Sequence, residues 1–252
     1  RWYAGWLAKD FVKPFAFGEV DTDRVTKTLD EREGDILGEA ETRPLLETYG
    51  LDLVPGGLAE NAEEAVQIAQ EIGYPVAIKV VSPQILHKSD MGGIKLNLRS
   101  DAELRKGVRT MKKVLSQRAP EAEIQGYLVE RMASEGMEVI VGMRRDPSFG
   151  PLMMFGLGGV TVELLKDVGF GVAPLTRDQA RDMIESTRAG RLVQGYRGGL
   201  VYDVEAVIEA IGRLSQLALD HPIIAEVEIN PLLVLPDGGG AKVLDARMIL
   251  KE

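Results

Sequence analysis

Segments of strand length and segments of helix length alternate along this chain from Glu39 to near its end. The strands are short apolar or alternating runs, whereas the helices repeat apolar residues with a period near 3.6. The pattern predicts helices at 41–49, 61–73, 101–116, 176–187 and from 203 onward, and strands at 75–81, 94–98, 127–131, 138–143, 152–155 and 223–230. Such an order is typical of a mixed α/β (α+β) protein.

The 252 residues are enough for one large domain or two small ones. We expect an N-terminal linker or extension at 1–38, a first subdomain at 39–125 and a second at 126–252. Residues 1–38 begin with an aromatic face and continue as an acidic stretch broken by glycine, which favours a connection to an upstream domain. The aromatic face consists of Trp2, Tyr3, Trp6 and Leu7.

The net charge of −9 and the isoelectric point near 5.0 argue against a nucleic-acid partner, because nucleic acids bind to basic protein surfaces. The sequence has no cysteine, so it offers no disulfide, thiolate metal site or cysteine nucleophile. No apolar run reaches the length of a membrane span. We therefore expect a cytoplasmic protein without a membrane partner.

Lys79 lies inside the apolar run 75–81, where a charged residue is costly unless an anion accompanies it. Two interpretations stay open for this residue. Its partner is either a structural carboxylate or the phosphate of a ligand.

The loop at 82–93 joins this strand to the next one and contains several candidate functional residues. Gly92 and Gly93 allow close backbone approach, and free N–H groups there can cradle phosphate oxygens. The alternative is that the pair marks only a tight turn. His87 is either a surface histidine or a nucleophile whose ring Asp90 orients. The second histidine, His221, precedes a proline, and we interpret it as structural.

Polar residues close the strands in the middle of the chain. Backbone groups at the break after Glu130, Arg131 and Met132 can pair with a purine edge, and the carboxylate of Glu138 can accept from ribose hydroxyls. From the residues alone, the preferred interpretation of each is an ordinary polar strand end. Arg144 can supply a cation to a phosphate. The glycine-rich run at 155–159 matches neither the Rossmann fingerprint nor the Walker loop, which excludes both of those nucleotide folds by motif.

The last strands carry a candidate metal site. Residues 223–230 alternate, so Glu228 and Asn230 share a face, and the turn at 236–240 returns the chain as a second strand with Asp245. Hard oxygen ligands of this kind suit Mg²⁺, which shares its remaining positions with water and phosphate. The alternative is a solvated acidic face.

The ordered set of motifs resembles one family. Tyr-Pro-Val-Ala-Ile-Lys, His-Lys-Ser-Asp-x-Gly-Gly, Val-Glu-Arg-Met, Phe-Gly-Leu-Gly-Gly, Glu-Ile-Asn-Pro-Leu and Leu-Asp-Ala-Arg follow one another between residues 74 and 247. Together they resemble the ATP-grasp half of NDP-forming acyl-CoA synthetases, which are relatives of succinyl-CoA synthetase β chains. The resemblance covers about residues 39–251.

The resemblance implies an ATP-grasp fold of two mixed α/β subdomains that clasp ATP or ADP with Mg²⁺. It implies that Lys79, Gly92 and Gly93 contact phosphates and that His87 relays a phosphoryl group. It further implies that the adenine pocket lies at 130–132, that Glu138 reaches the ribose, and that the metal ligands are Glu228, Asn230 and Asp245.

The resemblance also implies a partner, a CoA-binding and ligase-type domain or an α subunit, because no CoA-binding motif is found in these residues. The expected function is the phosphoryl-transfer part of an acid–thiol ligase. The alternative is a nucleotide-sensing regulatory module of a fused acetyltransferase-like protein. Another ATP-grasp ligase, of the carboxylate–amine type, is disfavoured by the loop at 87–93.

Overall fold

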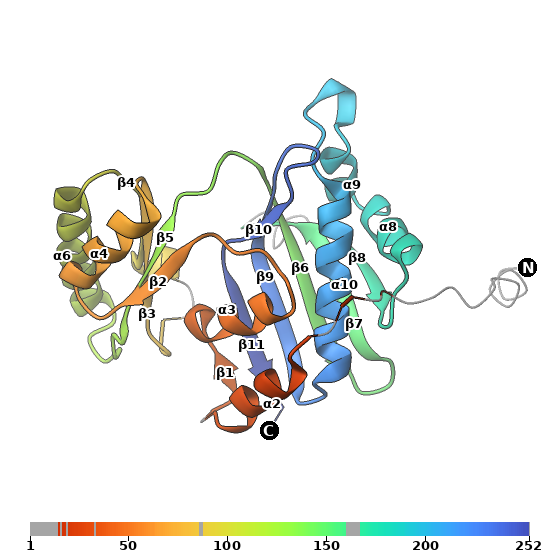
Figure 1. The fold of residues 1–252 in the computed structure, drawn as a ribbon, viewed down its shortest axis with the longest axis horizontal. Helices are drawn as coiled ribbons and strands as arrows, with labels where there is room; N and C mark the ends of the chain where they lie inside the picture. Colours follow the sequence, from red (N-terminus) through yellow and green to blue (C-terminus); the bar gives the residue numbers. More distant parts are fainter. Residues whose placement is uncertain are drawn as a thin grey trace, which may run out of the picture.

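The computed structural model describes residues 15, 17–18, 20–32, 34–85, 88–159 and 167–251. These residues form two antiparallel sheets with helices packed on them, and each sheet has its own hydrophobic core. Figure 1 shows the small sheet with its two helices as a lobe beside the larger part of the molecule, and α3 lies between the two parts. No described helix is long and apolar enough to cross a membrane.

The small sheet has the order β2-β5-β3-β4. Two helices, α4 (Ala62–Ile72) and α6 (Asp101–Arg118), cover it and pack against each other. The strand β3 is buried along almost its whole length, as the apolar run around Lys79 predicts. The strands are β2 (Gly56–Ala59), β3 (Val76–Val81), β4 (Ile94–Leu98) and β5 (Gly126–Arg131).

The large sheet has the order β1-β11-β9-β6-β7-β8, and β10 pairs beside β11 on the long strand β9. Its strands are β1 (Ile36–Leu37), β6 (Met137–Asp146), β7 (Gly150–Leu157), β8 (Val168–Val172), β9 (Ile224–Val234), β10 (Ala241–Val243) and β11 (Ala246–Leu250). The alternating burial along β7, in which Met153 and Phe155 face the core, follows from helices packing on that face.

Helices cover the core face of the large sheet, with α10 in front of it in Figure 1. An apolar stripe along α10 is fully buried, because it crosses β6, β7 and β9. The helices of this part are α2 (Thr22–Asp30), α3 (Glu39–Thr48), α8 (Arg177–Glu185), α9 (Arg188–Val193) and α10 (Val204–Asp220), with a short 3₁₀ turn η1 (Tyr196–Gly198). A capping box, in which Thr176 and Gln179 exchange hydrogen bonds, begins α8.

The pairing of β5 corrects the predicted boundary at residue 126. That boundary assigns residues 126–131 to the second subdomain, whereas β5 pairs with both β2 and β3 of the small sheet. The chain passes to the large sheet only in the connection at 132–136. The strand β5 pairs in the small sheet because its apolar side chains complete the small core. The sequence alone does not reveal this pairing.

The N-terminal region also differs from a free linker. Val25 and Leu29 of α2 are buried in the large core, and Leu37 of β1 pairs with Met248 of β11. The helix α3 packs on β1 and β11, so the start of the predicted first subdomain belongs with the large sheet. The predicted face formed by Trp2, Tyr3, Trp6 and Leu7 lies outside the described residues.

Candidate functional site

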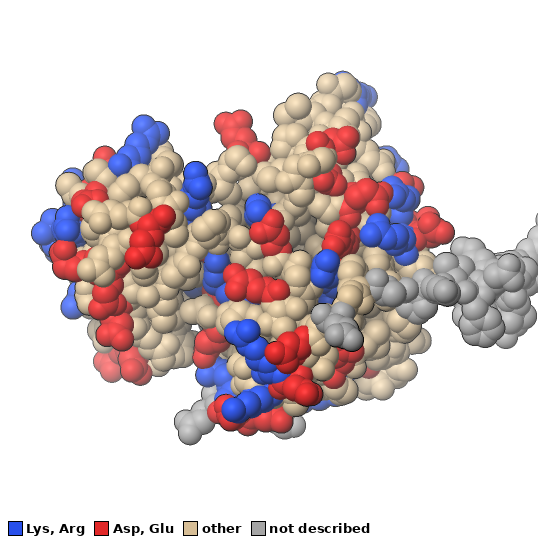
Figure 2. Space-filling view, in the orientation of Figure 1, with Lys and Arg blue, Asp and Glu red and all other residues tan. Residues whose placement is uncertain are grey.

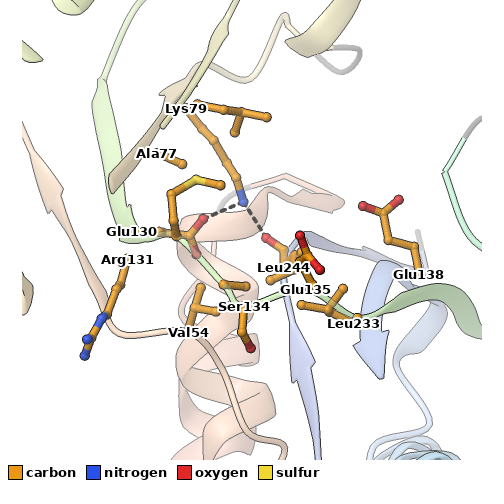
Figure 3. Close-up of a pocket in the computed structure, with 14 residues that line it drawn as sticks. Val54, Ala77, Lys79, Glu130, Arg131, Ser134, Glu135, Glu138, Leu233 and Leu244 are labelled. Carbon is orange, nitrogen blue, oxygen red and sulfur yellow. Dashed lines mark hydrogen bonds and ion pairs between the residues drawn. The ribbon is translucent and has the colours of Figure 1, made fainter. Parts of the chain in front are cut away.

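A cavity of about 270 Å³ lies where the two sheets face each other (Figure 3). Strands β3, β4 and β5 form one wall, and β6, the end of β9 and the segment before β11 form the other. The connection at 132–136 closes one side. The space-filling view shows the molecule hollowed between the small lobe and the rest, with acidic and basic side chains interspersed around it (Figure 2).

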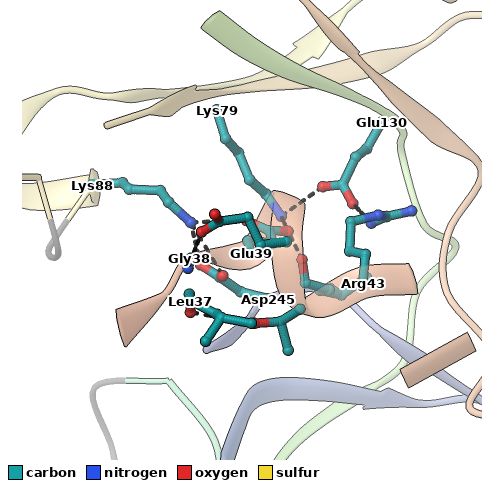
Figure 4. A network of polar contacts seen from close by, with 11 residues as sticks. Leu37, Gly38, Glu39, Arg43, Lys79, Lys88, Glu130 and Asp245 are labelled. Carbon is teal, nitrogen blue, oxygen red and sulfur yellow. Dashed lines mark hydrogen bonds and ion pairs between the residues drawn. The ribbon is translucent and has the colours of Figure 1, made fainter. Parts of the chain in front are cut away.

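Lys79 projects from β3 toward this region and is almost fully buried, with 7% of its surface exposed. Its ammonium group lies 2.6 Å from Glu39 Oε1 and 2.5 Å from Glu130 Oε2, and it donates to the carbonyl oxygen of Leu244 (Figure 4). An ammonium group has three N–H donors, and here all three have protein acceptors. The structural carboxylate is therefore the partner that this structure gives to Lys79.

Further ion pairs extend this network on both sides. Arg43 of α3 pairs with Glu130 and also donates to the carbonyl oxygen of Val54, 2.6 Å away. Lys88 lies 2.8 Å from Glu39 Oε2 and 3.2 Å from Asp245 Oδ1. The three cations, Arg43, Lys79 and Lys88, thus balance the three carboxylates, Glu39, Glu130 and Asp245.

The network shifts the proton equilibria of its members. For Glu39, burial opposes ionisation, but the charges of Lys79 and Lys88 outweigh burial, and they hold the pKa of this carboxyl below its usual value. Burial lowers the pKa of Lys79, but the carboxylates around it raise the pKa by more. Burial and the negative charge of Glu39 raise the pKa of Asp245 to about 7. Both lysines and Glu39 are therefore charged at neutral pH.

Several residues that the sequence assigns to nucleotide binding meet at the cavity. Lys79, Glu130, Arg131, Met132 and Glu138 all line it. The side chain of Arg131 points away from the cavity in Figure 3, whereas the carboxylate of Glu138 stands at its rim.

The backbone N–H groups that are free to bind a base lie further along the chain than expected. The N–H of Arg131 donates to Pro55 and that of Met132 to Pro75, so neither is free for a base. Two residues later, the backbone groups of Ser134 and Glu135 form no hydrogen bond to another described residue. The N–H groups of this connection that are open to a ligand are therefore those of Ser134 and Glu135, and the carbonyl oxygen of Met132 likewise accepts no hydrogen bond from a described residue.

The glycine pair does not match the free cradle that the sequence predicts. The N–H of Gly93 donates to Lys88 and that of Gly92 to Ser89, so both close α5 (Lys88–Met91). A Cβ at Gly93 would lie 2.5 Å from Val80, and this close packing on β3 requires glycine there. Asp90 is exposed in α5. His87 lies outside the described residues.

Arg144 does not reach the cavity. It lies on β6, six residues beyond Glu138 and opposite Glu226 of β9. Six residues of extended strand span about 20 Å. The sequence could not exclude Arg144, because a short loop after residue 143 would have turned it back toward the cavity, whereas β6 continues to Asp146.

The predicted metal ligands lie at adjoining positions. The backbone N–H of Asn230 donates to the carbonyl oxygen of Asp245 at 2.9 Å. Asp245 sits in the break between β10 and β11 rather than inside a strand, which turns its carboxylate toward Lys88. The side-chain oxygen of Asn230 accepts from Gly159, and its amide nitrogen lies 3.2 Å from Glu228.

Glu228 is held more tightly by a cation than Asp245 is, since Lys88 approaches Asp245 only to 3.2 Å. Arg247 donates to Glu228 Oε2 at 2.6 and 3.0 Å, so its charge is already compensated. The described residues contain no group of three His, Cys, Asp or Glu side chains placed to hold a metal. Asp245 and Asn230 nevertheless offer hard oxygen atoms, and a cation held by them would take its other ligands from phosphate and water.

Three residues that complete the network escaped the site assignment from sequence. Glu39 and Arg43 stand one helical turn apart on α3, which is a weak signal for a shared face. Lys88 is adjacent to a candidate residue. No local pattern connects Glu39 with Lys79, forty residues later, because the contact forms only when α3 packs beside the small sheet.

Comparison with known proteins agrees with this architecture. The ATP-grasp domain family matches residues 28–250. This chain belongs to the ATP-grasp family. The ATP-grasp fold and the resemblance that the motifs carry are thereby confirmed.

Two curated relatives of this ATP-grasp chain are similar over most of its length. The β subunit of acetate–CoA ligase [ADP-forming] I from Pyrococcus furiosus is 45% identical over 90% of this chain and 100% of its own length. The acetate–CoA ligase [ADP-forming] I of Archaeoglobus fulgidus is 43% identical over 99% of this chain. This chain spans only 36% of that longer relative.

A solved structure of a similar protein contains ligands. It is the dinucleotide-forming acetyl-coenzyme A synthetase 1 of Ca. Korarchaeum cryptofilum in complex with coenzyme A and Mg-AMPPCP, with its phosphohistidine segment pointing towards the nucleotide binding site. The identity is 41% and the TM-score 0.76, over 91% of this chain and 99% of the other.

Proposed function

We propose that this ATP-grasp chain is the nucleotide-binding, phosphoryl-transfer part of an ADP-forming acyl-CoA synthetase. The overall reaction converts acyl-CoA, ADP and phosphate into carboxylic acid, CoA and ATP. The observation that carries the proposal is the cavity between the two sheets, with a buried ammonium group at one wall and a carboxamide–carboxylate pair nearby. The kinship with ADP-forming ligases supports it.

Each part of the cavity suits a part of ADP or ATP. The apolar side chains of Val54, Ala77 and Leu233 line a slot for a base, and the open backbone at 134–135 can pair with its edge. Glu138 is placed to accept from ribose hydroxyls. Lys79 then meets the phosphates, where its charge offsets theirs.

Asp245 and Asn230 are the residues that would hold Mg²⁺. The ion neutralises phosphate charge and fixes phosphate orientation when it is bound. The chain itself contributes the positions of its charged groups, and the dry wall formed by Leu244 and Leu233 limits the access of water. Glu228 is a weaker candidate because Arg247 already engages it.

The partner in this proposal is a CoA-binding, ligase-type domain or α subunit that supplies the acyl substrate site. It is motivated by the names of the relatives, one a β subunit and one a longer single chain. His87 stays a proposed phosphoryl relay on the strength of its motif. A phosphoryl label on His87 that is stable to base and lost in acid, formed only in the assembled enzyme, is the measurement that decides this.

Calorimetry of the chain with Mg·ADP tests the proposed function. Asp245→Asn should weaken Mg²⁺-dependent binding by about 1–3 kcal/mol, the usual loss when a charged partner of a desolvated ion is removed. Asp237→Asn is the matched control, because Asp237 is an exposed acid in the turn that joins β9 and β10.

Equal affinity of the Asp245→Asn variant and the parent would refute the metal assignment. Absence of any nucleotide binding by the parent would refute the proposed function itself. Binding without ATP formation in the presence of the partner, CoA and acyl substrate would instead favour the regulatory alternative.

A further inference from the structure

Glu39 is a buried carboxylate whose two oxygens hold two different lysines. It is the first residue of α3 and is only 4% exposed. Oε1 accepts from Lys79 at 2.6 Å and Oε2 accepts from Lys88 at 2.8 Å (Figure 4). One carboxylate therefore sets the spacing between two ammonium groups that would otherwise repel each other.

The carboxylate and the lysines come from different parts of the molecule. Helix α3 packs on β1 and β11 of the large sheet, whereas Lys79 belongs to β3 of the small sheet and Lys88 begins α5 beside it. Glu39 thus reaches from the large sheet to the small sheet beside Lys79, which lines the cavity. The arrangement fixes where the small sheet presents its cations.

Stability does not account for such a group. Burying an ion pair costs solvation that the mutual attraction of the charges repays only with good geometry, and an apolar replacement is often as stable. Buried charges arranged around a cavity are typical of functional sites. The charge of Glu39 calls for an explanation in the chemistry of the site.

We propose that Glu39 is a positioning residue that aims Lys79 and Lys88 together at the phosphate groups of the nucleotide. This inference rests on the proposed function. Protein kinases provide a physical parallel, since a helix glutamate must pair with a strand lysine before that lysine can serve the phosphates. Lys88 thereby becomes a second phosphate-binding cation.

The strengths of the three acceptors of Lys79 indicate which of them a phosphate oxygen would replace. Glu39 and Glu130 are charged acceptors, whereas the carbonyl oxygen of Leu244 is neutral. Hydrogen bonds to charged acceptors are the stronger ones. A phosphate oxygen therefore takes the place of Leu244, which lines the cavity, and Glu39 keeps the ammonium group in position.

Calorimetric titration of the intact chain with Mg·ADP and, separately, with adenosine tests this role. Glu39→Gln should weaken Mg·ADP binding by roughly tenfold or more, as expected when a charged partner of a buried ion is removed. Adenosine binding should not change, because adenosine has no phosphate for the lysines. Glu47→Gln on the exposed side of α3 is the matched control and should bind both ligands like the parent.

A second variant covers the case in which Glu39→Gln does not fold. Lys88→Met keeps the pair between Glu39 and Lys79, and it should likewise weaken Mg·ADP binding severalfold while leaving adenosine binding unchanged. Glu39→Asp, one methylene shorter, should restore part of the affinity for Mg·ADP, since it keeps the charge.

Unchanged or tighter Mg·ADP binding by Glu39→Gln would overturn the positioning role. An equal loss of Mg·ADP and adenosine binding would also overturn it, because that result indicates a structural role only. If Lys88→Met binds Mg·ADP like the parent, Lys88 is not a phosphate ligand. A parent that binds neither ligand would fail the proposed function, which is a distinct result.

Discussion

Lys79 illustrates what a charged residue inside a buried strand requires. Its position in an apolar run predicts an anionic partner, and the structure supplies Glu39 and Glu130. The sequence could not choose between a carboxylate and a ligand phosphate, because both satisfy the same ammonium group. The two interpretations are compatible, since one of the three acceptors of Lys79 is a neutral carbonyl oxygen that a phosphate can replace.

His221 is a second buried titratable residue, and it serves the structure as predicted from its place before a proline. It is 4% exposed, with Nε2 2.8 Å from the hydroxyl of Tyr49 and Nδ1 3.3 Å from that of Thr26. The hydroxyl group of Tyr49 donates a hydrogen bond to the carboxylate of Asp220. The neutral tautomer with a proton on Nε2 therefore satisfies every partner.

The contribution of His221 to the free energy of unfolding should fall as the pH drops below about 6.5, the ordinary histidine value. Burial lowers the pKa of His221 in the folded protein, against the opposing charges of Asp220 and Asp30. The unfolded chain therefore binds more protons in this window, and protonation favours unfolding. Above the unfolded value the contribution of His221 is fully present.

Urea denaturation at pH 7 and pH 5 measures this effect. His221→Gln should remove the His221 contribution, so its free energy of unfolding should fall less between pH 7 and pH 5 than that of the parent. His87→Gln, which changes the other histidine of the chain, is the control. A parent and a His221→Gln variant with the same slope would show that His221 does not report on folding.

Helix α4 shows how much of an element the sequence can specify. Asn61 accepts from the N–H groups of Glu63 and Glu64, each at 3.0 Å, and Gly73 ends the helix with a positive φ of 85°. These signals are local, so both ends of the helix could be predicted. The same holds for α8, whose capping box begins at Thr176.

Asn61→Ala should lower the free energy of unfolding by about 1 kcal/mol, because two N–H groups lose their cap. Asn61→Asp keeps an acceptor oxygen and should stay close to the parent. Thermal or chemical denaturation followed by circular dichroism measures both. An alanine variant as stable as the aspartate variant would mean that water replaces the cap without cost.

Elements that depend on distant pairing were harder to predict. The strand β5 follows a turn and reads like the start of a new subdomain, but it fills the centre of the small sheet between β2 and β3. Likewise, Asp245 reads as part of a strand, whereas β10 and β11 leave it in the break between them. The register of β10 and β11 against β9 decides where these strands begin and end. Register depends on pairing between residues that are far apart in the chain.

At the scale of the whole molecule, two cores are separated by the cavity and by the ion pairs beside it. The small core gathers around β3, β5 and α6, and the large core gathers around β6, β9 and α10. Ion pairs and the connection at 132–136 join them. Because neither core lends apolar contacts to the other, each should open as its own cooperative unit.

Leu104→Ala in α6 should destabilise the small core by about 2–5 kcal/mol, the usual range for a leucine that is fully buried. Hydrogen exchange should then accelerate in β3 and β5 and change little in β6 and β9. Leu214→Ala in α10 is the matched variant and should give the reverse pattern. Equal acceleration in both sheets would indicate a single cooperative unit.

The sequence by itself determined the order of the main helices and strands, the caps of α4 and α8, the ATP-grasp resemblance and five residues of the cavity wall. Those features depend on local backbone preferences and on motifs of a few residues. Only the tertiary structure decided which strand joins which sheet, that Arg144 lies far from the cavity, and that Glu39 holds Lys79 and Lys88. These features depend on contacts between side chains that are far apart in the chain. Such side chains meet because the apolar faces pack into two cores, and the charged groups then lie at the boundary between the cores.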